Sequence, residues 1–536
     1  MSRRRRLTEI AWKTISIGLI IFTGLKTEVK PVTAEGEHIG QRQETGEADL
    51  TSTQIEFVGN TVFSDSQLRK VVASMTESTL SLPKLIEIRS KITDYYVQQG
   101  YASTSALIPP QDLNDGTIKV QIIEGQLKAI ETEGLSHLQR SYLDARLPQV
   151  GEVLNVNTLR RSLSELQEDP LIEDLDAQLV EVSPGQNVVN LEIIENSPLD
   201  SRFAVTNTFS PSVGTVGGTA NIDYHLLGFG DIVNLGYTRT ESEGLIRYNA
   251  GYSLPVNRND GKLAFSYVNA DAQIIEEPIS ALDIQADFEV YQLGFRQPIR
   301  LNNNSELAVE VKTELIDSQT FADDDIPNAF VAGLENEDAR SQISALRLIQ
   351  EYFNRSDRSS IAIRSQFNLG VDLFDPTVTE VGRDGLFWSW QGQMQWLRRI
   401  NDLMLVSNLN LQLTPDQLLP VEQITLGGSN SVRGYRQNLS IGDNGAIGNV
   451  ELRIPLIEST ASSIKLNPFV AAGTIWNNSS EEIETDTLVS TGLGLSYELR
   501  ELIEARIDYA IPLIEADAPS DFSTEQEFTF LLLVKP

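Results

Sequence analysis

The sequence predicts two tandem α+β modules followed by a transmembrane antiparallel β-barrel of about sixteen strands. Three observations lead to this fold class. The order strand, helix, helix, strand, strand occurs twice between residues 52 and 197. From about residue 200 the helical spacing of apolar residues gives way to runs of about ten residues with period two. The N-terminus carries a basic stretch and a short apolar run of the kind that directs export.

Residues 1–34 are interpreted as a secretory signal peptide. The basic segment SRRRRLTEIAWK precedes an apolar run at 14–25, and Val32-Thr33-Ala34 offers small residues for cleavage. The alternative is a membrane anchor, but the apolar run is shorter than the roughly 20 residues that a spanning helix needs. Residues 35–51 are polar and are expected to be a flexible lead-in.

The first predicted module covers residues 52–125. Ser64 is suited to cap its first helix, and Gly100 is suited to end its second. Ile118, Val120 and Ile122 alternate with polar residues, which indicates a strand with one buried face. We expect strands at 53–60, 103–110 and 116–125, and helices at 64–75 and 81–99, the second with an apolar stripe of Leu82, Leu85, Ile88, Ile92 and Tyr95.

The second predicted module covers residues 126–198 and repeats this order. Asn157 is the expected N-cap of its longer helix, and Pro170 follows that helix. The buried stripe of the helix is predicted to be Leu159, Leu163 and Leu166. We expect strands at 126–135, 174–184 and 187–196 and a short helix at 138–148.

Residues 199–536 are predicted to form the barrel. In WSWQGQMQW (388–396), Trp388, Trp390 and Trp396 share one face and the glutamines share the other. Apolar-out and polar-in alternation with interfacial aromatic residues is typical of a transmembrane barrel. A soluble sandwich or propeller also alternates, but mid-strand charges such as Glu310 and Lys312 fit a wet lumen better.

Composition excludes several function classes. The 536-residue chain has no cysteine, and its three histidines lie far apart, so no metal site is expected. The net charge of −33 disfavours nucleic acid as a partner. The sequence contains no phosphate-binding loop and no nucleophile elbow, so we expect no cofactor and no catalytic residues. An enzyme embedded in the barrel would need a site, but the acidic pair Glu481-Glu482 has no accompanying base or nucleophile and is interpreted as a solvated loop.

The stretch GGSNSVRGYR at 427–436 lies in a polar connection of about thirty residues, a length typical of functional loops. Its glycines allow a tight path, and Arg433 offers a guanidinium fork that could bind a carboxylate on a lumen-facing strand. A loop folded inward and held in this way would gate the pore. The alternative is a solvated surface loop whose arginine has no special role.

The segment LLPVEQITLGGSNSVRGYR resembles the sixth extracellular loop of two-partner secretion transporters, the hemolysin secretion/activation proteins. The core of that motif is Val432, Arg433, Gly434 and Tyr435. Residues 95–127 resemble the end of that family's first polypeptide-transport-associated (POTRA) domain, and 207–237 resemble its first barrel hairpin. The resemblance covers residues 52–536.

The resemblance implies two POTRA domains in the periplasm and a sixteen-stranded barrel in the outer membrane. Such a protein exports an unfolded, secreted partner protein without nucleotide hydrolysis, and its POTRA domains capture that partner, in part by β-augmentation. Periplasmic chaperones and the barrel-assembly machinery would serve its own biogenesis. Two rivals remain: a barrel-assembly factor of the same superfamily, which usually has more POTRA domains, and a passive porin, which needs none.

Three departures from the family pattern matter. In the family, the loop arginine pairs with an aspartate two residues after a phenylalanine; here Phe469 and Gly473 are kept, but Ala471 stands at the aspartate position. Glu451, on the strand after the loop, is the candidate substitute acceptor. Residues 35–50 lack the apolar spacing of a plug helix. The chain ends FTFLLLVKP, with Phe530 six positions inside the terminus that an aromatic residue commonly occupies.

Overall fold

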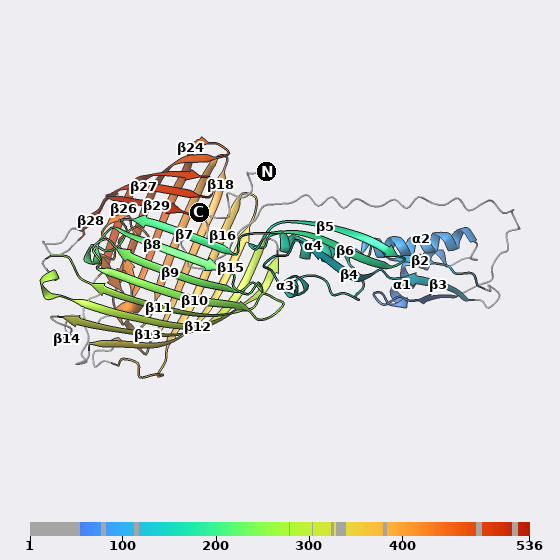
Figure 1. The fold of residues 1–536 in the computed structure, drawn as a ribbon, viewed down its shortest axis with the longest axis horizontal. Helices are drawn as coiled ribbons and strands as arrows, with labels where there is room; N and C mark the ends of the chain where they lie inside the picture. The colour runs from blue at the N-terminus through green and yellow to red at the C-terminus, as the bar shows by residue number, and fades with distance from the viewer. Residues whose placement is uncertain are drawn as a thin grey trace. The chain divides into compact units, whose positions relative to one another are not determined.

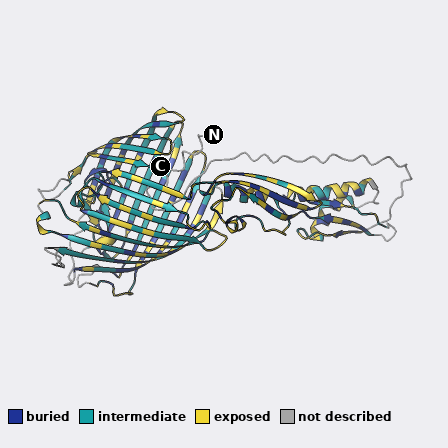
Figure 2. Cartoon of the chain, in the orientation of Figure 1, coloured by how far each residue is buried: buried dark blue, intermediate teal, exposed yellow. Residues whose placement is uncertain are grey.

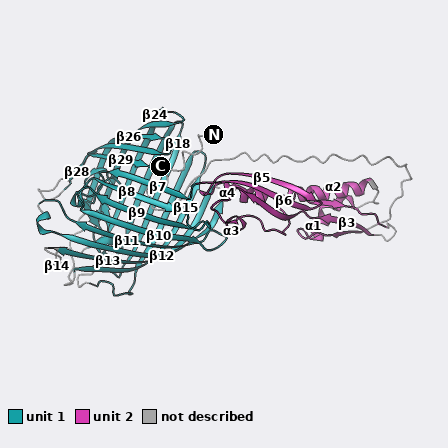
Figure 3. Cartoon of the chain, in the orientation of Figure 1, with its two compact units in different colours: residues 1–21, 197–536 teal, residues 22–196 magenta. Residues whose placement is uncertain are grey.

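The computed structural model describes residues 54–76, 82–111, 117–277, 279–302, 304–322, 326–327, 339–378, 383–478, 485–516 and 524–536. The predicted signal peptide and lead-in and the Glu481-Glu482 pair lie outside the described residues. Figure 1 shows small α/β modules in the N-terminal part and a large barrel in the C-terminal part. They belong to two compact units, and the boundary between them falls between Asn196 and Ser197 (Figure 3).

The first module is a three-stranded sheet covered by two helices. The sheet has the order β1-β3-β2, with β1 parallel and β2 antiparallel to β3. Ile118 and Val120 of β3 are fully buried against Ile88 and Ile92 of α2. The predicted stripe is confirmed for Leu85, Ile88 and Ile92, while Tyr96 rather than Tyr95 is the fully buried tyrosine, and the Leu82 side chain lies outside the described part. The elements are β1 (Gln54–Val58), α1 (Asp65–Val72), η2 (Ala73–Met75), α2 (Leu82–Gln98), β2 (Ser105–Leu107) and β3 (Thr117–Ile123).

The second module has the same plan, with sheet order β4-β6-β5. Leu159, Leu163 and Leu166 of α4 are buried, as predicted. The predicted cap Asn157 is wrong: the N-cap is Asn155, whose side chain accepts hydrogen bonds from the backbone of Asn157 (2.9 Å) and Thr158 (3.3 Å). The elements are β4 (Gln126–Glu133), α3 (Arg140–Asp144), α4 (Val156–Gln167), β5 (Ile172–Ser183) and β6 (Gln186–Glu195).

In each module a carboxylate ties the end of the last strand to the loop after the first strand, and in the first module this carboxylate, Glu124, is buried. Glu124 accepts hydrogen bonds from the backbone of Thr61 (2.8 Å) and Val62 (2.9 Å) and from the Tyr96 hydroxyl (2.8 Å). Burial alone would raise the pKa of Glu124, but these hydrogen bonds to its charged form outweigh burial and lower the pKa below its ordinary value.

Glu195 takes the same position in the second module. It accepts hydrogen bonds from the backbone of Ser136 (2.9 Å), His137 (2.8 Å) and Leu138 (3.0 Å). Here too burial acts to raise the pKa, and the hydrogen bonds lower it further than burial raises it. The repetition that the element order predicted therefore extends to an equivalent pair of carboxylates.

The barrel has sixteen antiparallel strands and closes between β29 and β7, as predicted (Figure 1). From β11 onward short connections alternate with longer ones, and a two-residue strand, β14 (Ile326–Pro327), lies in one of the longer ones. The barrel strands are β7 (Leu199–Thr206), β8 (Gly217–Tyr224), β9 (Ile232–Thr240), β10 (Leu245–Pro255), β11 (Lys262–Gln273), β12 (Gln285–Asn302), β13 (Ser305–Ala322), β15 (Arg340–Arg355), β16 (Ser359–Gly370), β18 (Trp388–Ile400), β19 (Leu403–Leu413), β24 (Asn444–Glu458), β25 (Ser462–Trp476), β26 (Thr485–Leu499), β27 (Ile503–Pro512) and β29 (Phe528–Val534).

The closing seam is short. Only four residue pairs, from Phe203–Val534 to Thr206–Leu531, join β7 and β29 among the described residues. Beyond them the side chain of Asn207 substitutes for the backbone ladder: it donates to the Phe528 carbonyl (2.9 Å) and accepts from the Phe530 amide (2.7 Å). Phe530 thus lies inside the last strand, at the point where a side-chain amide closes the barrel.

The faces of the strands follow the period-two prediction, and Figure 2 shows exposed and less exposed residues alternating along them. On β18, Trp388 is exposed on the outer face, while Gln391 donates from the inner face to Gln412 of β19 (2.8 Å). Farther along the inner face, Gln395 donates to Asn408, which donates to Asn449 of β24 (3.0 and 2.9 Å). Within the described part of the chain, no helix is long and apolar enough to cross a membrane.

Candidate functional site

The stretch that contains Arg433 belongs to the connection between β19 and β24, residues 414–443, here called loop six because it is the sixth connection at the end of the barrel where β7 leads into β8. Its middle is a small hairpin in which β21 pairs with β23. The loop also pairs with two other connections: β20 with β17 (Arg383–Asp384) and β22 with β28 (Glu525–Gln526). Its elements are β20 (Gln417–Leu418), η6 (Pro420–Glu422), β21 (Ile424–Leu426), β22 (Gly434–Tyr435) and β23 (Ser440–Gly442).

Loop six is not a solvated surface loop at its motif. Val432, Arg433, Gly434 and Tyr435 are all buried. Val432 and Tyr435 join an apolar cluster with Leu426 of the loop and with inward-facing residues of the barrel wall, Ile447, Ala471, Ile475 and Leu488. The loop therefore folds into the lumen and packs on strands β24, β25 and β26.

Gly473 makes room for this packing. A Cβ atom at Gly473 would lie 2.6 Å from Leu426 Cδ1 and 3.2 Å from Val432 Cγ2, so a larger residue would press on the loop. Ala471, two residues earlier on the same face of β25, is buried in the same cluster. At the position where the family pattern places an aspartate, this chain thus has an alanine that packs against apolar residues of the loop.

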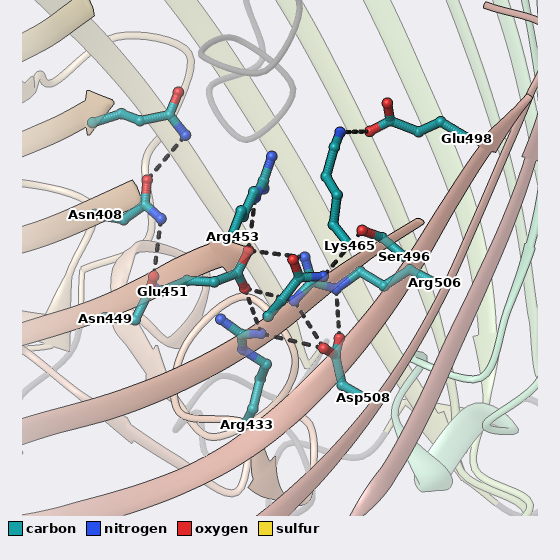
Figure 4. Close-up of polar contacts among 12 residues, drawn as sticks. Asn408, Arg433, Asn449, Glu451, Arg453, Lys465, Ser496, Glu498, Arg506 and Asp508 are labelled. Carbon is teal, nitrogen blue, oxygen red and sulfur yellow. Dashed lines mark hydrogen bonds and ion pairs between the residues drawn. The ribbon is translucent and has the colours of Figure 1, made fainter. Parts of the chain in front are cut away.

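Arg433 extends from the loop to a set of charged side chains on the wall (Figure 4). Its Nη1 donates to Glu451 Oε2 of β24 (3.0 Å) and lies 3.5 Å from Asp508 Oδ1 of β27. The guanidinium carbon lies 3.7 Å from the centre of the Phe469 ring, within range of a cation–π interaction. Of the site residues predicted from the sequence, the structure therefore brings Arg433, Glu451 and Phe469 together.

Two further arginines complete the cluster. Arg506 of β27 donates to Glu451 (2.6 Å) and to Asp508 (2.7 Å), and Arg453 of β24 donates to Glu451 (2.9 Å). Three guanidinium groups thus face two carboxylates, and the wall keeps its own ion pairs whether or not the loop arginine is present. Sequence reasoning missed Arg453, Arg506 and Asp508; the signal for the latter two was their alternation with Ile507 and Tyr509 in IEARIDYAIP, which places both in the lumen.

The residues around Arg433 hold it in place. Gly434 has φ +96°, and a Cβ there would lie 3.1 Å from Ala510 Cβ, so glycine lets the loop backbone lie close to β27. The Tyr435 hydroxyl lies 2.8 Å from the Val489 carbonyl oxygen and 2.7 Å from that of Ile514. Val432 packs on the wall, Arg433 forms ion pairs, and Gly434 lets the backbone lie close to β27. Tyr435 bonds to β26 and to the connection between β27 and β29, so each residue of the motif has its own contact.

Arg436 links loop six to other connections rather than to a barrel strand. Its guanidinium donates to Glu276 in the connection between β11 and β12 (2.6 Å) and to the Ser212 hydroxyl between β7 and β8 (2.9 Å). The loop is therefore held at its motif by the wall and just after it by neighbouring loops.

Comparison with family models agrees with this architecture. The model described as "Haemolysin secretion/activation protein ShlB/FhaC/HecB" matches residues 185–497. The model "POTRA domain, ShlB-type" matches residues 50–125.

Similar proteins and structures have the same overall plan. The chain is 22% identical over 486 residues to the outer membrane transporter CdiB of Escherichia coli, covering 83% of this chain and 76% of that protein. It is also 22% identical over 477 residues to CdiB of Dickeya dadantii (strain 3937), covering 84% and 81%. The solved structure of CdiB from Escherichia coli aligns with a TM-score of 0.68 at 19% identity, covering 95% of this chain and 94% of that one. A BamA structure from Haemophilus ducreyi lacking POTRA domains 1–3 aligns at 0.54 and 15% identity, covering 91% and 100%.

The first family match spans more than half of the 536 residues and includes the last strand of the second module, most of the barrel and all of loop six. The chain belongs to the haemolysin secretion/activation family, the outer-membrane transporters of two-partner secretion.

Proposed function

We propose that this transporter moves its unfolded partner protein through the barrel lumen, and that loop six is the gate of that path. The observation that carries the proposal is the burial of Arg433 between Glu451 and Phe469. A loop that occupies the lumen and is held there by an arginine must be displaced before a polypeptide can pass. No step in this scheme requires nucleotide hydrolysis or a catalytic residue.

The two POTRA modules would receive the partner on the periplasmic side. Among the described residues, β5 pairs with another strand, β6, on one side only, so it is an edge strand, although Leu175 near its start already bonds to side chains. An extended segment of the partner can add to such an edge by β-augmentation. Chaperones that keep the partner unfolded, and the machinery that inserts the barrel, belong to the same proposal.

The test is an export assay in cells that produce this chain together with a candidate partner, chosen as a large secreted protein from a neighbouring reading frame. Export of that protein to the surface or medium should depend on this chain and should fall when Arg433 is replaced by alanine. An assembly factor would instead change the abundance of other outer-membrane barrels. Normal export without the chain, together with loss of other barrels, would overturn the export proposal in favour of assembly.

A further inference from the structure

Loop six has a second buried ion pair, near its start, on a different part of the barrel wall. Glu422 ends η6, and its carboxylate accepts from both terminal nitrogens of Arg347 of β15, at 2.6 and 3.1 Å. Both side chains are buried. Arg347 also donates through Nε to Glu314 of β13. The two-point contact is the bidentate geometry in which a guanidinium binds a carboxylate most strongly.

Apolar packing supports the same half of the loop. Leu418 and Leu419, just before η6, are buried against Ile343 and Ala345 of β15 and Ile316 of β13. The start of loop six therefore lies on the wall formed by β13 and β15, whereas its motif lies on the wall formed by β24 to β27.

These two walls are far apart around the barrel. Counted from β7 without the short β14, β13 and β15 are the seventh and eighth barrel strands, and β24 and β27 are the twelfth and fifteenth. β13 and β27 thus lie eight positions apart in either direction. Residues 422–433 cross between the two walls, with the loop carboxylate bound at one end and the loop arginine bound at the other.

The charges on each wall remain compensated when the loop leaves. Arg347 keeps Glu314 if Glu422 is withdrawn. Glu451 keeps Arg506 and Arg453 if Arg433 is withdrawn. Breaking a buried pair is costly mainly because it strands an unpaired charge, and both walls avoid that penalty. This arrangement suits a contact that must open and close.

We propose that Glu422 and Arg347 form a second latch of loop six, and that the loop must leave both this pair and the Arg433 site for the pore to open. The inference rests on the proposed gate. Glu422 is a positioning residue: it holds the loop across the lumen and does not itself act on the exported chain.

The experiment measures single-channel currents of the full-length protein in planar bilayers, with export measured separately in cells. Glu422→Gln keeps the shape of the side chain and removes its charge, so open events should become several-fold more frequent. Glu422→Gln combined with Arg433→Ala should open more often than either alone. Glu501→Gln, an exposed carboxylate on the turn between β26 and β27, is the matched control and should behave as the unaltered protein. Barrel folding is checked for every variant by heat-modifiable migration on gels.

A second variant should make the pore open less often rather than more often. Glu314→Gln removes the competing wall carboxylate and leaves Glu422 as the carboxylate bonded to Arg347 among the described residues, so open events should become rarer. A general loss of stability would instead change the frequency of open events in the same direction for Glu314→Gln and Glu422→Gln.

The outcomes separate the latch from the export proposal. Bilayer currents need no partner protein, so the latch is supported if Glu422→Gln and Glu314→Gln change opening in opposite directions, even if export proves to be wrong. The latch is overturned if a folded Glu422→Gln barrel has the currents of Glu501→Gln, or if both charge variants shift opening the same way.

Discussion

The guanidinium of Arg433 lies 3.7 Å from the centre of the Phe469 ring while Nη1 donates to Glu451 at 3.0 Å. Glu451 and Phe469 face each other directly across the β24–β25 pair. The register of two neighbouring strands thus presents one carboxylate and one aromatic face to a single arginine of the loop.

Replacing Arg433 by alanine should leave membrane insertion and heat-resistant migration normal but reduce export and alter channel currents. A partly desolvated charged hydrogen bond is worth roughly 1.5–3 kcal/mol, which is enough to hold a loop but small beside the strand pairing of a barrel. Arg433→Lys should restore function poorly because lysine lacks the planar fork. Export by Arg433→Ala at the normal rate would contradict the gate.

Replacing Glu451 by alanine should be more damaging than replacing Arg433. Arg433 and Arg506 would then share Asp508, and Arg453 would lose the carboxylate with which it pairs among the described residues. Uncompensated buried charge costs about 3–5 kcal/mol. We expect a lower temperature for the gel shift of the folded barrel in addition to reduced export. Equal thermal stability of Glu451→Ala and Arg433→Ala would show that the other arginines do not depend on Glu451.

A disulfide between loop six and the wall should lock the pore. The chain contains no cysteine, so Val432→Cys with Gly473→Cys introduces the only pair. A Cβ at Gly473 would lie 3.2 Å from Val432 Cγ2, which is close to the spacing that a disulfide needs. Oxidation should stop export and a reducing agent should restore it, with each single cysteine variant as control. Unchanged export by the oxidised, cross-linked protein would mean that the loop need not move from β25.

The tryptophans of β18 should face lipid. Trp388 is exposed on the outer face, and Trp390 and Trp396 share its side of the strand. Brominated lipids should therefore quench tryptophan fluorescence strongly in the unaltered protein. Replacing all three by phenylalanine should remove most of the quenching and leave Trp476 as background. Quenching that survives the triple replacement would place these side chains elsewhere.

A fragment of residues 52–197 should fold cooperatively and lose stability in acid. The folded modules hold the pKa values of Glu124 and Glu195 below the ordinary value of 4.5, so the unfolded state takes up protons first as the pH falls. Their contribution is present above about pH 4.5 and disappears as the pH falls through the folded pKa.

Variants of the fragment test the cause of that acid sensitivity. Glu195→Gln should lower the free energy of unfolding by roughly 1.5–3 kcal/mol at neutral pH, because hydrogen bonds to a charged acceptor are replaced by weaker ones. The free energy of unfolding should also depend less on pH in the acid range. Glu131→Gln, an exposed position on β4, is the control. Chemical denaturation followed by circular dichroism measures both effects. A flat, non-cooperative melt of the unaltered fragment would contradict the tandem-module fold.

Period-two alternation was sufficient to predict the strand faces, because each side chain of a barrel strand faces either lipid or lumen. The loop motif was recognised from its residues, but its contacts depend on how strands distant in sequence are placed around the barrel. Arg506 and Asp508 lie more than fifty residues beyond Glu451, on a strand separated from β24 by β25 and β26, and only the folded sheet brings them to it. The Asn155 cap shows a local limit, since two asparagines of the same chemistry flank the helix start and only backbone dihedrals distinguish them.

The row of amides from Gln391 and Gln395 of β18 through Asn408 to Asn449 of β24 gives this arc of the lumen no fixed charge. Its hydrogen bonds run from strand to strand within the wall. From Gln391 and Gln395 of β18 to Asn408 of β19, a polypeptide that slides along this arc meets neither a cation nor an anion, whereas Glu451 and Arg453 follow Asn449 on the lumen face of β24. Friction along the arc should therefore depend little on the charge of the travelling segment or on ionic strength, so one conduit can serve the acidic and basic stretches of a single long cargo.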